Sequence, residues 1–368
     1  MIEWIEFNPT MICQSPFLQP QPTIKGKFTG CSYCYSAEGM PHTTKEVRIF
    51  KEKELATEQI QNFIDQISEL GIKRMCILGG GPQLRDDFNE IMMYACKKIT
   101  LVHLTTNGIG TKKHLETLLK IPLLEISIDS NKIVYASQVR PLLQVQAAFR
   151  SIDLLHKKHP FLCINTVVTP SVLPSLWNFI RWAFNEKNIK KINLYPLLNG
   201  GSKELRITRA QAEEIMLNVK ANYKIITENY CKSGKHMVVD YDGSIVPCAA
   251  FLGSGVNTGN ALHLKEAMNN PLLKKFQKYN FKSIAPKSSK AFESPNCPGK
   301  KLYDSNWMEP AVEKTSIEFL STDKYCMRCS TKQDNDATTC KYCGFCYFDN
   351  KPFSMVCSCF SILNPKYF

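Results

Sequence analysis

Residues 75–82 read MCILGGGP, a short apolar run that ends in three glycines and a proline. The apolar run is typical of a buried strand, and the glycines and proline are typical of a turn. A helical pattern follows, with apolar side chains on one face at Phe88, Ile91, Met92, Ala95 and Cys96. This order predicts one strand–loop–helix unit.

The same order repeats along the first 200 residues. Runs typical of strands occur at Trp4–Phe7, Met75–Leu78, Leu101–Thr105, Leu124–Ile128, Leu162–Val168 and Lys191–Leu197. Two further helical faces lie at Ile60, Phe63, Ile64, Ile67 and Leu70, and at Leu173, Leu176, Trp177, Ile180 and Phe184. Six such units predict an α/β fold with a parallel sheet, either doubly wound or a partial barrel. In both, ligands bind at the carboxyl ends of the strands.

The composition is that of a globular protein, with 44% of the 368 residues apolar and 21% charged. The sequence contains no run of 18 apolar residues, so no transmembrane helix is predicted. The opening MIEWIEFNPT lacks the basic region of a signal peptide. We therefore expect a cytoplasmic protein without membrane contact, whose thiols stay reduced. The net charge of +13 favours anionic partners.

The sequence has 16 cysteines. Three of them, Cys76, Cys96 and Cys163, lie inside strand or helix patterns and are interpreted as small core residues. Residues 30–35, GCSYCY, place Cys31 and Cys34 in the loop after the first strand. Two thiolates at this spacing can bind an iron–sulfur cluster, form a redox pair or supply half of a zinc site. Their position at the ligand-binding edge of the predicted sheet favours the cluster.

This loop resembles the cysteine motif of the radical SAM superfamily. In that family three cysteines, usually spaced C-x3-C-x2-C with an aromatic residue before the last, hold a [4Fe–4S] cluster that binds S-adenosylmethionine (SAM). The resemblance covers about residues 1–200 and implies a partial (β/α)6 barrel. It also implies that Cys31 and Cys34 are cluster ligands and that Tyr33 is the aromatic residue beside the cofactor.

The first cysteine of the motif is missing at its usual position, which Lys27 occupies. Cys13, in the segment NPTMICQ that leaves the first strand, is the expected replacement. Residues 15–29 then resemble an insertion within the motif, and the spacing becomes C-x17-C-x2-C. The candidate catalytic residues are therefore Cys13, Cys31 and Cys34.

The loops at the ends of the next strands extend the resemblance. LGGGP at 78–82 resembles the family's G-G-E-P loop, TTNG at 105–108 its T-N-G turn, and SIDS at 127–130 its S-x-D segment near the ribose. Arg140 matches an arginine that meets the methionine carboxylate in related maturases. The resemblance thus implies SAM contacts from Gly79, Gly80, Gly81, Asn107, Ser127, Asp129 and Arg140. Taken alone, Asn-Gly is a common turn and Arg140 a residue of a solvated helix.

The pattern changes after residue 201. A helix is expected at about Thr208–Ala221, and then a hairpin of Met237–Asp240 and Ile245–Val246 turned by Asp-Gly. Cys231, Cys248 and Cys297 resemble ligands of the SPASM extension, the auxiliary-cluster domain of many radical SAM peptide-modifying enzymes. The resemblance implies one or more auxiliary [4Fe–4S] clusters, although Lys300 stands where a further ligand is expected.

From about residue 321 the chain is rich in cysteine and poor in apolar periodicity, so its folding is expected to need metal. Cysteines at metal-binding spacing are Cys326, Cys329, Cys340, Cys343 and Cys346. They suit either zinc or an iron–sulfur cluster. The expected division of the chain is 1–205 (radical SAM partial barrel), 206–230 (bridging helix and linker), 231–300 (SPASM-like region) and 301–368 (metal-binding tail).

These resemblances imply an enzyme that reductively cleaves SAM to a 5′-deoxyadenosyl radical, which abstracts hydrogen from a substrate. The expected substrate is a peptide or protein that is crosslinked, oxidised or epimerised. Expected partners are a reductant such as flavodoxin or ferredoxin and a separate peptide-recognition protein, since no such domain precedes the first strand. Two alternatives stay open. One is action on tRNA or a small metabolite, consistent with +13. The other is a decayed, zinc-stabilised binding module.

Overall fold

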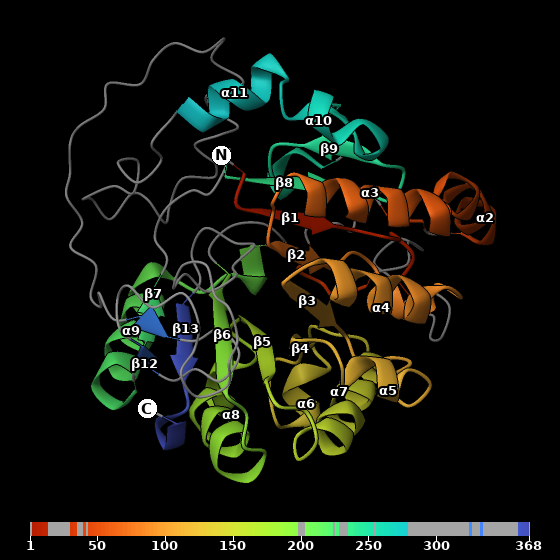
Figure 1. Ribbon diagram of the computed structural model, residues 1–368. Coiled ribbons are helices and arrows are strands. Elements are labelled where there is room, and N and C mark those ends of the chain that lie inside the picture. The colour runs from red at the N-terminus through yellow and green to blue at the C-terminus, as the bar shows by residue number, and fades with distance from the viewer. Residues whose placement is uncertain are drawn as a thin grey trace. The chain divides into compact units, whose positions relative to one another are not determined.

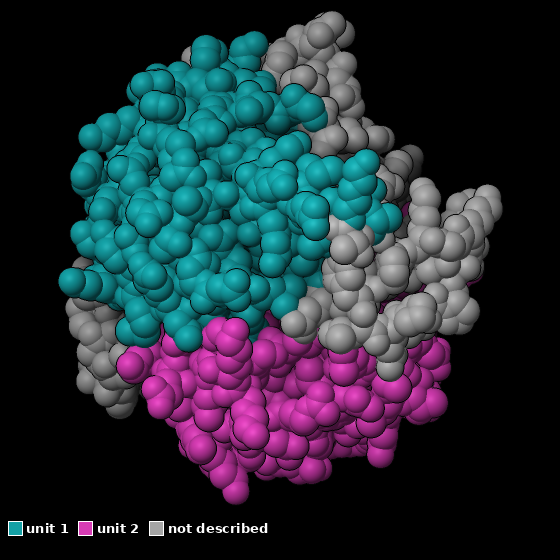
Figure 2. Space-filling view, turned by 90° about the vertical axis from the view of Figure 1, so that its right-hand side faces the viewer, with its two compact units in different colours: residues 1–13, 36–102, 229–317 teal, residues 14–35, 103–228, 318–368 magenta. Residues whose placement is uncertain are grey.

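The computed structural model describes residues 2–13, 30–34, 40–41, 43–197, 203–223, 225–227, 235–252, 255–278, 324–325, 332–333 and 360–367. The chain forms two compact units, which Figure 2 colours separately. The first unit takes residues 1–13, 36–102 and 229–317, and the second takes 14–35, 103–228 and 318–368. Each unit thus combines three separate stretches of the chain. The domain boundaries expected from the sequence stay a prediction.

The sheet of the first unit is built around β1 (Trp4–Phe7). This strand pairs in parallel with β2 (Arg74–Ile77) on one side and with β8 (His236–Val239) on the other (Figure 1). The sheet continues antiparallel through β9 (Ser244–Val246) and β10 (Gly259–Asn260). The predicted hairpin of β8 and β9 is therefore confirmed. Its pairing with β1 was not predicted, because segments so far apart in sequence leave no local pattern.

The helices of the first unit are α2 (Thr44–Lys53), α3 (Thr57–Glu69), α4 (Phe88–Lys98), α10 (Leu264–Ala267) and α11 (Pro271–Lys278). Helices α3 and α4 pack side by side (Figure 1). Of the predicted face of α3, the side chains with no exposed surface are Ile60, Phe63, Ile64 and Ile67. Burial of this face fixes the helix against the sheet, as its 3.6-residue periodicity predicts.

The second unit contains the other parallel strands. They are β3 (Leu101–Thr106), whose first two residues belong to the first unit, β4 (Leu123–Ser127), β5 (Leu162–Val168) and β6 (Lys191–Pro196). These strands pair in sequence order (Figure 1). Two further strands, β13 (Phe360–Leu363) and β7 (Ile225–Thr227), extend the sheet antiparallel beyond β6. Part of the expected metal-binding tail therefore forms a strand of this sheet.

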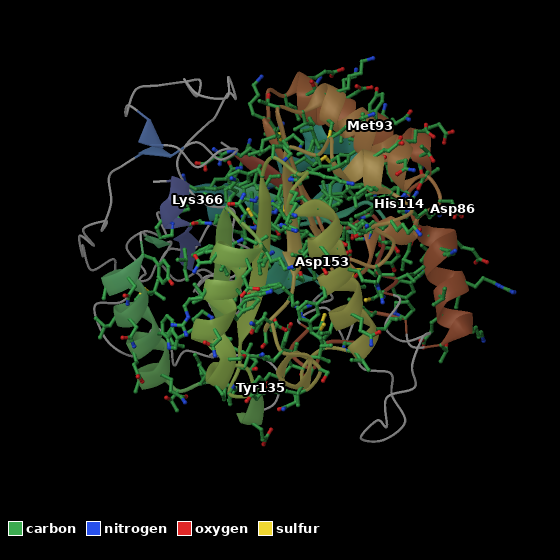
Figure 3. The ribbon with its side chains drawn as sticks, turned by 90° about the horizontal axis from the view of Figure 1, so that it is seen from below. Asp86, Met93, His114, Tyr135, Asp153 and Lys366 are labelled. Carbon is green, nitrogen blue, oxygen red and sulfur yellow. The ribbon has the colours of Figure 1, made fainter. Side chains whose placement is uncertain are left out.

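The helices of the second unit are α5 (Leu115–Leu118), α6 (Ile133–Ala136), α7 (Leu142–Leu155), α8 (Leu176–Arg181) and α9 (Arg209–Asn222). Figure 3 labels Tyr135 on α6 and Asp153 on α7. The predicted helical face from Leu173 to Phe184 is divided. A 3-10 turn containing Pro174 precedes α8, and a π-helical turn, Trp182–Glu186, follows it. Helix α7 was not among the predicted helical faces.

The predicted α/β fold class with parallel strands is confirmed, and the predicted strands all form within one or two residues of their expected ends. Cys76 and Cys163 have no exposed surface, and burial raises the pKa of the half-buried Cys96 to about 12. The predicted core position is confirmed for Cys76 and Cys163, whereas Cys96 is half-buried. Among the described helices, none combines the length and the apolar character that crossing a bilayer requires.

Candidate functional site

The turn Cys31–Cys34 lies in the second unit, tied to the segment that joins α6 to α7. The amide of Cys34 donates to the carbonyl of Cys31 at 2.9 Å, which closes a tight turn and leaves both thiols half-buried. The amide of Ser32 donates to the carbonyl of Val139 at 2.9 Å. A backbone bond therefore anchors the turn to the chain just before Arg140.

Asp129 and Arg140 form a buried ion pair at the carboxyl end of β4. The Arg140 Nε donates to Asp129 Oδ2 at 2.6 Å and the Nη2 donates to Oδ1 at 3.2 Å, so the contact is bidentate. Asp129 has no exposed surface and Arg140 is 7% exposed. The amide of Val167 on β5 also donates to Asp129 Oδ1, at 2.9 Å. A charge pair with this many partners holds both side chains in one geometry.

Tyr33 connects the cysteine turn to that ion pair. Its hydroxyl donates to Asp129 Oδ2 at 2.7 Å, and the Arg140 guanidinium lies 5.4 Å from its ring centre. Burial raises the pKa of Tyr33 well above its usual value, against the opposing charge of Arg140. The phenol therefore stays protonated and remains a donor to the carboxylate.

Arg140 and Asp129, which the resemblance assigns to two different parts of SAM, are thus partners of one another. Arg140 Nη1 also lies 3.6 Å from Cys31 Sγ. The resemblance to the family implied separate positions for Tyr33, Asp129 and Arg140 at one edge of the sheet. The structure joins the three side chains to Cys31 in a single network.

Asn107 and Ser127 lie at the carboxyl ends of β3 and β4. The Asn107 Oδ1 accepts from the amide of Ile109 at 3.0 Å and stabilises the turn. Gly108 has φ +86°, and a Cβ there would lie 2.6 Å from Ser151 Oγ on α7, so the turn needs glycine. Ser127 is half-buried at the end of its strand. Their expected contacts with SAM stay a prediction.

Cys13 lies in the first unit, in the loop that follows β1. The loop is held by the Ile12 amide, which donates to Thr10 Oγ1 at 3.0 Å, and by the Gly80 amide, which donates to the Thr10 carbonyl at 2.9 Å. Cys13 itself is 8% exposed. Because Cys31 and Cys34 belong to the second unit, the grouping of all three cysteines stays a prediction.

The glycine loop after β2 packs directly against the Cys13 loop. A Cβ on Gly79, which has φ +99°, would lie 2.6 Å from the Thr10 carbonyl oxygen, and one on Gly80 would lie 2.5 Å from that of Ile12. Both positions therefore require glycine. A Cβ on Gly81 would meet Leu84 at 3.2 Å, so this position is less constrained. The glycines thus shape the Cys13 loop, a role that the sequence motif did not indicate.

Arg85 also holds this loop, and sequence reasoning did not single it out. Its Nη1 donates to the Pro9 carbonyl at 3.1 Å and to Glu54 Oε2 at 3.1 Å, while its Nη2 lies 2.7 Å from Asp87 Oδ2. The sequence motifs do not indicate Arg85, because its role is to hold a backbone carbonyl of the Cys13 loop in place. Its position three residues after the glycine loop was the only signal available.

Cys248 is the one residue of the expected auxiliary-cluster set that the structure describes. It is 9% exposed and packs with the apolar side chains Val238, Val246, Phe251, Val256 and Phe276. Its expected partners and the tail cysteines lie outside the described residues, namely Cys231, Cys297, Cys326, Cys329, Cys340, Cys343 and Cys346. The auxiliary site therefore stays a prediction.

A second buried polar network, which the sequence analysis did not predict, crosses the sheet of the second unit. Its centre is Glu125 on β4, which is 1% exposed. Glu125 Oε2 lies 2.9 Å from His103 Nε2 and accepts from Asn165 Nδ2 at 2.6 Å. Its Oε1 accepts from Asn193 Nδ2 at 2.7 Å and lies 3.5 Å from Lys191 Nζ. These contacts bring side chains from four strands, two of them from β6, onto the same face of the sheet.

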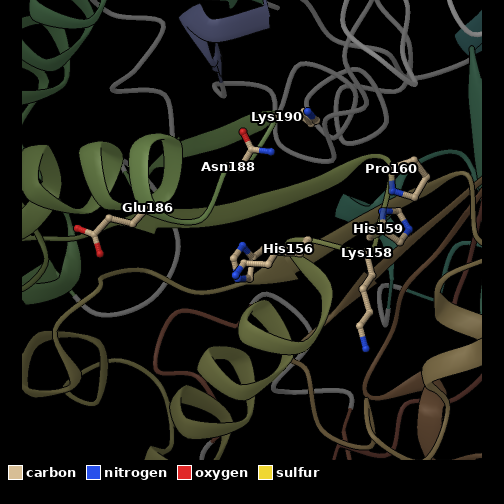
Figure 4. Close-up of a pocket in the computed structure, with 8 residues that line it drawn as sticks. His156, Lys158, His159, Pro160, Glu186, Asn188 and Lys190 are labelled. Carbon is tan, nitrogen blue, oxygen red and sulfur yellow. The ribbon is translucent and has the colours of Figure 1, made fainter.

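A cavity of about 470 Å³ lies at the opposite edge of the same unit, where β5 and β6 begin (Figure 4). Its lining residues are His156, Lys157, Lys158, His159, Pro160, Glu186, Asn188 and Lys190. Burial and the charges of Lys187 and Lys157 lower the pKa of His156. Ligands of parallel α/β sheets bind at the carboxyl ends of the strands, whereas this cavity lies at the amino ends of β5 and β6. The cavity is therefore separate from the site around Cys31.

The donors at Cys31 and Cys34 fit part of the expected cluster. Two thiols on one tight turn beside a guanidinium are suited to binding iron as thiolates, because a nearby positive charge favours the thiolate. Within the described ranges, no group of three or more His, Cys, Asp or Glu side chains is placed to hold a metal ion. The turn would therefore supply two ligands, and the third is still assigned only by the expectation for Cys13.

Comparisons with known proteins agree with this geometry. The family model described as "Radical SAM superfamily" matches residues 28–183. The GTP 3',8-cyclase of Synechocystis sp. is 24% identical over 202 residues, which span 53% of this chain and 59% of that protein. The GTP 3',8-cyclase of Helicobacter pylori is 23% identical over 293 residues, which span 71% of this chain and 86% of that protein.

Among solved structures, Streptococcus suis SuiB bound to its precursor peptide SuiA has a similar fold. The TM-score is 0.52 at 17% identity, over 77% of this chain and 69% of that one. The sequence match to the Synechocystis relative covers less than two thirds of that protein. The family model nevertheless includes the cysteine turn, Asp129 and Arg140, the residues that the structure joins in one network. Residues 28–183 of this chain therefore form a radical SAM domain, and the enzymes of that superfamily use a [4Fe–4S] cluster and SAM.

Proposed function

We propose that this chain reductively cleaves SAM and uses the resulting radical on a small polar substrate. The observation that carries the first part is the network that fastens the cysteine turn to the end of β4. Tyr33 reaches Asp129 at 2.7 Å, and Arg140 contacts both Asp129 and Cys31. Such a network holds a cluster-binding loop at the edge of the sheet where ligands bind.

Each residue of this site has a distinct task. Cys31 and Cys34 would ligate the cluster, which together with SAM supplies a 5′-deoxyadenosyl radical that abstracts hydrogen from the substrate. Asp129, buried and bound by three groups, orients Arg140. Tyr33 fixes the position of the cysteine turn relative to Asp129 and Arg140. Gly79 and Gly80 allow the Cys13 loop to approach the glycine loop closely.

A row of polar side chains at the same sheet edge supports a polar substrate. Thr105, Ser127 and Asn165 lie on adjacent parallel strands and are each half-buried. Thr105 and Asn165 both hydrogen bond to Glu125, and Ser127 follows Glu125 by two residues, so all three share one face of the sheet. Two hydroxyls and an amide there can bind neutral polar groups of a substrate.

The curated relatives support a small molecule as that substrate. Both reported relatives are named GTP 3',8-cyclase, and the Helicobacter match spans 71% of this chain. A purine nucleotide would offer hydrogen-bonding groups to the polar row, and the chain's net charge of +13 suits an anionic substrate. GTP is therefore the first substrate to test.

A peptide or protein substrate is the second candidate, and it is the one that the cysteine pattern of the C-terminal third favours. The fold resemblance to SuiB, a protein solved with its precursor peptide, agrees with it. For this candidate we propose modification by crosslinking, oxidation or epimerisation, with a separate protein to recognise the peptide. For either substrate, a flavodoxin or ferredoxin is the proposed reductant.

The two candidates differ in what accelerates SAM cleavage. We would reconstitute the full chain anaerobically, reduce it with dithionite, and measure 5′-deoxyadenosine by mass spectrometry with GTP, with tRNA and with a synthetic peptide mixture. We expect GTP to raise the rate at least tenfold and to be consumed. Stimulation by peptides alone would favour the second candidate. A protein that binds zinc but no iron or sulfide would contradict both.

A further inference from the structure

Cys31 differs from an ordinary exposed thiol in the two side chains around its sulfur. Arg140 Nη1 lies 3.6 Å from Cys31 Sγ, and Gln144 Oε1 lies 3.3 Å from it. Arg140 is 7% and Gln144 3% exposed, so both groups are held in the protein interior. The sulfur therefore faces two fixed polar groups on one side.

Both groups can donate to the sulfur once the thiol has lost its proton. Arg140 carries only N–H donors, and the second Asp129 contact, through Nη2, leaves Nη1 directed at the sulfur. In the thiol form Cys31 donates to the Gln144 carbonyl oxygen. A thiolate ligand has no proton to donate, and rotation of the amide by half a turn then presents Nε2 as a donor at the same place.

The position of Gln144 at the start of α7 brings its side chain to the Cys31 sulfur. Gln144 lies in the first turn of α7, two residues after its start, and Arg140 precedes the helix. The backbone bond from Ser32 to Val139 fixes the cysteine turn to this same segment. The Cys31 sulfur, Arg140 and Gln144 are therefore held together where the chain enters α7.

We propose that Arg140 and Gln144 are positioning residues that donate hydrogen bonds to Cys31 Sγ and make the cluster easier to reduce. Hydrogen bonds to a ligating sulfur stabilise the added electron, and they are among the features that set the potential of iron–sulfur clusters. This inference rests on the proposed role of Cys31 as a cluster ligand.

A series at Gln144 tests the proposal without relying on turnover. We would purify the full chain with its cluster as Gln144→Leu, Gln144→Glu and Gln144→Lys, and measure the midpoint potential by titration monitored with electron paramagnetic resonance. Gln144→Leu removes the donor, and Gln144→Glu replaces it with a negatively charged acceptor. Gln144→Lys keeps a donor at this position. Exposed Gln138 on the same segment provides a matched control, Gln138→Glu.

We expect the cluster to be easiest to reduce in Gln144→Lys and wild type, harder in Gln144→Leu and hardest in Gln144→Glu. In Gln144→Glu the ratio of reduced to oxidised cluster at a fixed solution potential should fall at least tenfold, which corresponds to about 59 mV for one electron. Gln138→Glu should leave the ratio within twofold of wild type.

Equal potentials across the Gln144 series, with the cluster present at wild-type iron and sulfide content, would overturn the proposal. So would a Gln144→Glu protein that is easier to reduce than wild type. A wild-type chain that assembles no iron–sulfur cluster would instead overturn the proposed function itself. Iron and sulfide analysis therefore separates the two failures.

Discussion

Two buried carboxylates, Glu125 and Asp129, lie four residues apart at β4 and have different surroundings. Glu125 is bound by side chains from the neighbouring strands, His103, Asn165, Lys191 and Asn193. Asp129 lies past the end of the strand, and two of its partners come from loops or helix junctions, namely Tyr33 and Arg140.

The difference shows how one strand can serve both stability and chemistry. The Glu125 network lies within the sheet, so its charged groups support the packing of four strands. The Asp129 network reaches out of the sheet and ends at a half-buried cysteine. We therefore expect changes at Glu125 to alter global stability, and changes around Asp129 to alter the cysteine turn first.

The largest expected effect follows the substitution Glu125→Gln. It removes one negative charge and leaves Lys191 and His103 buried without their carboxylate. Breaking a buried ion pair by removing one partner costs about 3–5 kcal/mol. Chemical denaturation should show a loss of this size, while Glu116→Gln, an exposed change on α5, should stay within about 0.5 kcal/mol of wild type. A loss below about 1 kcal/mol for Glu125→Gln would mean that the network does not hold the sheet together.

The pH dependence of stability should separate Glu125 from other acids. Burial by itself would raise its pKa, but His103 and Lys191 outweigh burial and lower the pKa from the usual 4.5 to about 2. Folding therefore stabilises the charged carboxylate of Glu125. Its stabilisation is fully present above pH 4.5 and is lost as the pH falls toward 2, by roughly 3 kcal/mol.

The matching measurement compares unfolding free energies of wild type and Glu125→Gln from pH 7 down to the lowest pH at which both fold. We expect the difference between them to shrink below pH 4.5. Parallel curves over the whole range would contradict the depressed pKa.

A smaller and more local effect is expected for Tyr33→Phe. The change removes the hydroxyl that donates to Asp129 at 2.7 Å and keeps the ring. A net loss of about 1 kcal/mol should appear as local opening of the turn, which corresponds to about fivefold faster alkylation of Cys31 in the metal-free protein. Mass spectrometry after iodoacetamide labelling would measure the rate.

We expect Tyr33→Phe to leave the global unfolding free energy unchanged and Glu125→Gln to lower it. If both changes lower global stability by the same amount, the two carboxylates belong to one cooperative network and the distinction between them fails.

Strand positions and strand-end motifs could be read from the sequence, because alternation, helical periodicity and glycine turns act over a few residues. Cys31 stood out as part of a C-x-x-C pair after the first strand, whereas Tyr33, Asp129 and Arg140 were identified through the resemblance to the radical SAM family. Their mutual contacts could not be predicted, because they depend on how α6 and α7 turn the chain back toward the cysteine loop.

The Glu125 network was missed for a related reason. Each of its charged or polar residues looks like an exception within an apolar strand, and only the register of four strands brings them together. Arg85 was missed because it acts on the backbone. The strand β13 and the pairing of β8 with β1 join segments remote in sequence, for which no local pattern exists.

The most direct test of the account is the release of 5′-deoxyadenosine from SAM by reduced, anaerobically reconstituted protein. It should be run beside Cys31→Ala, Cys13→Ala and, as a control on α4, Cys96→Ala. We predict product from wild type and Cys96→Ala, and none from the other two. Product from Cys13→Ala would remove the third-ligand assignment alone. Undiminished product from Cys31→Ala would show that this cysteine turn does not hold the cluster.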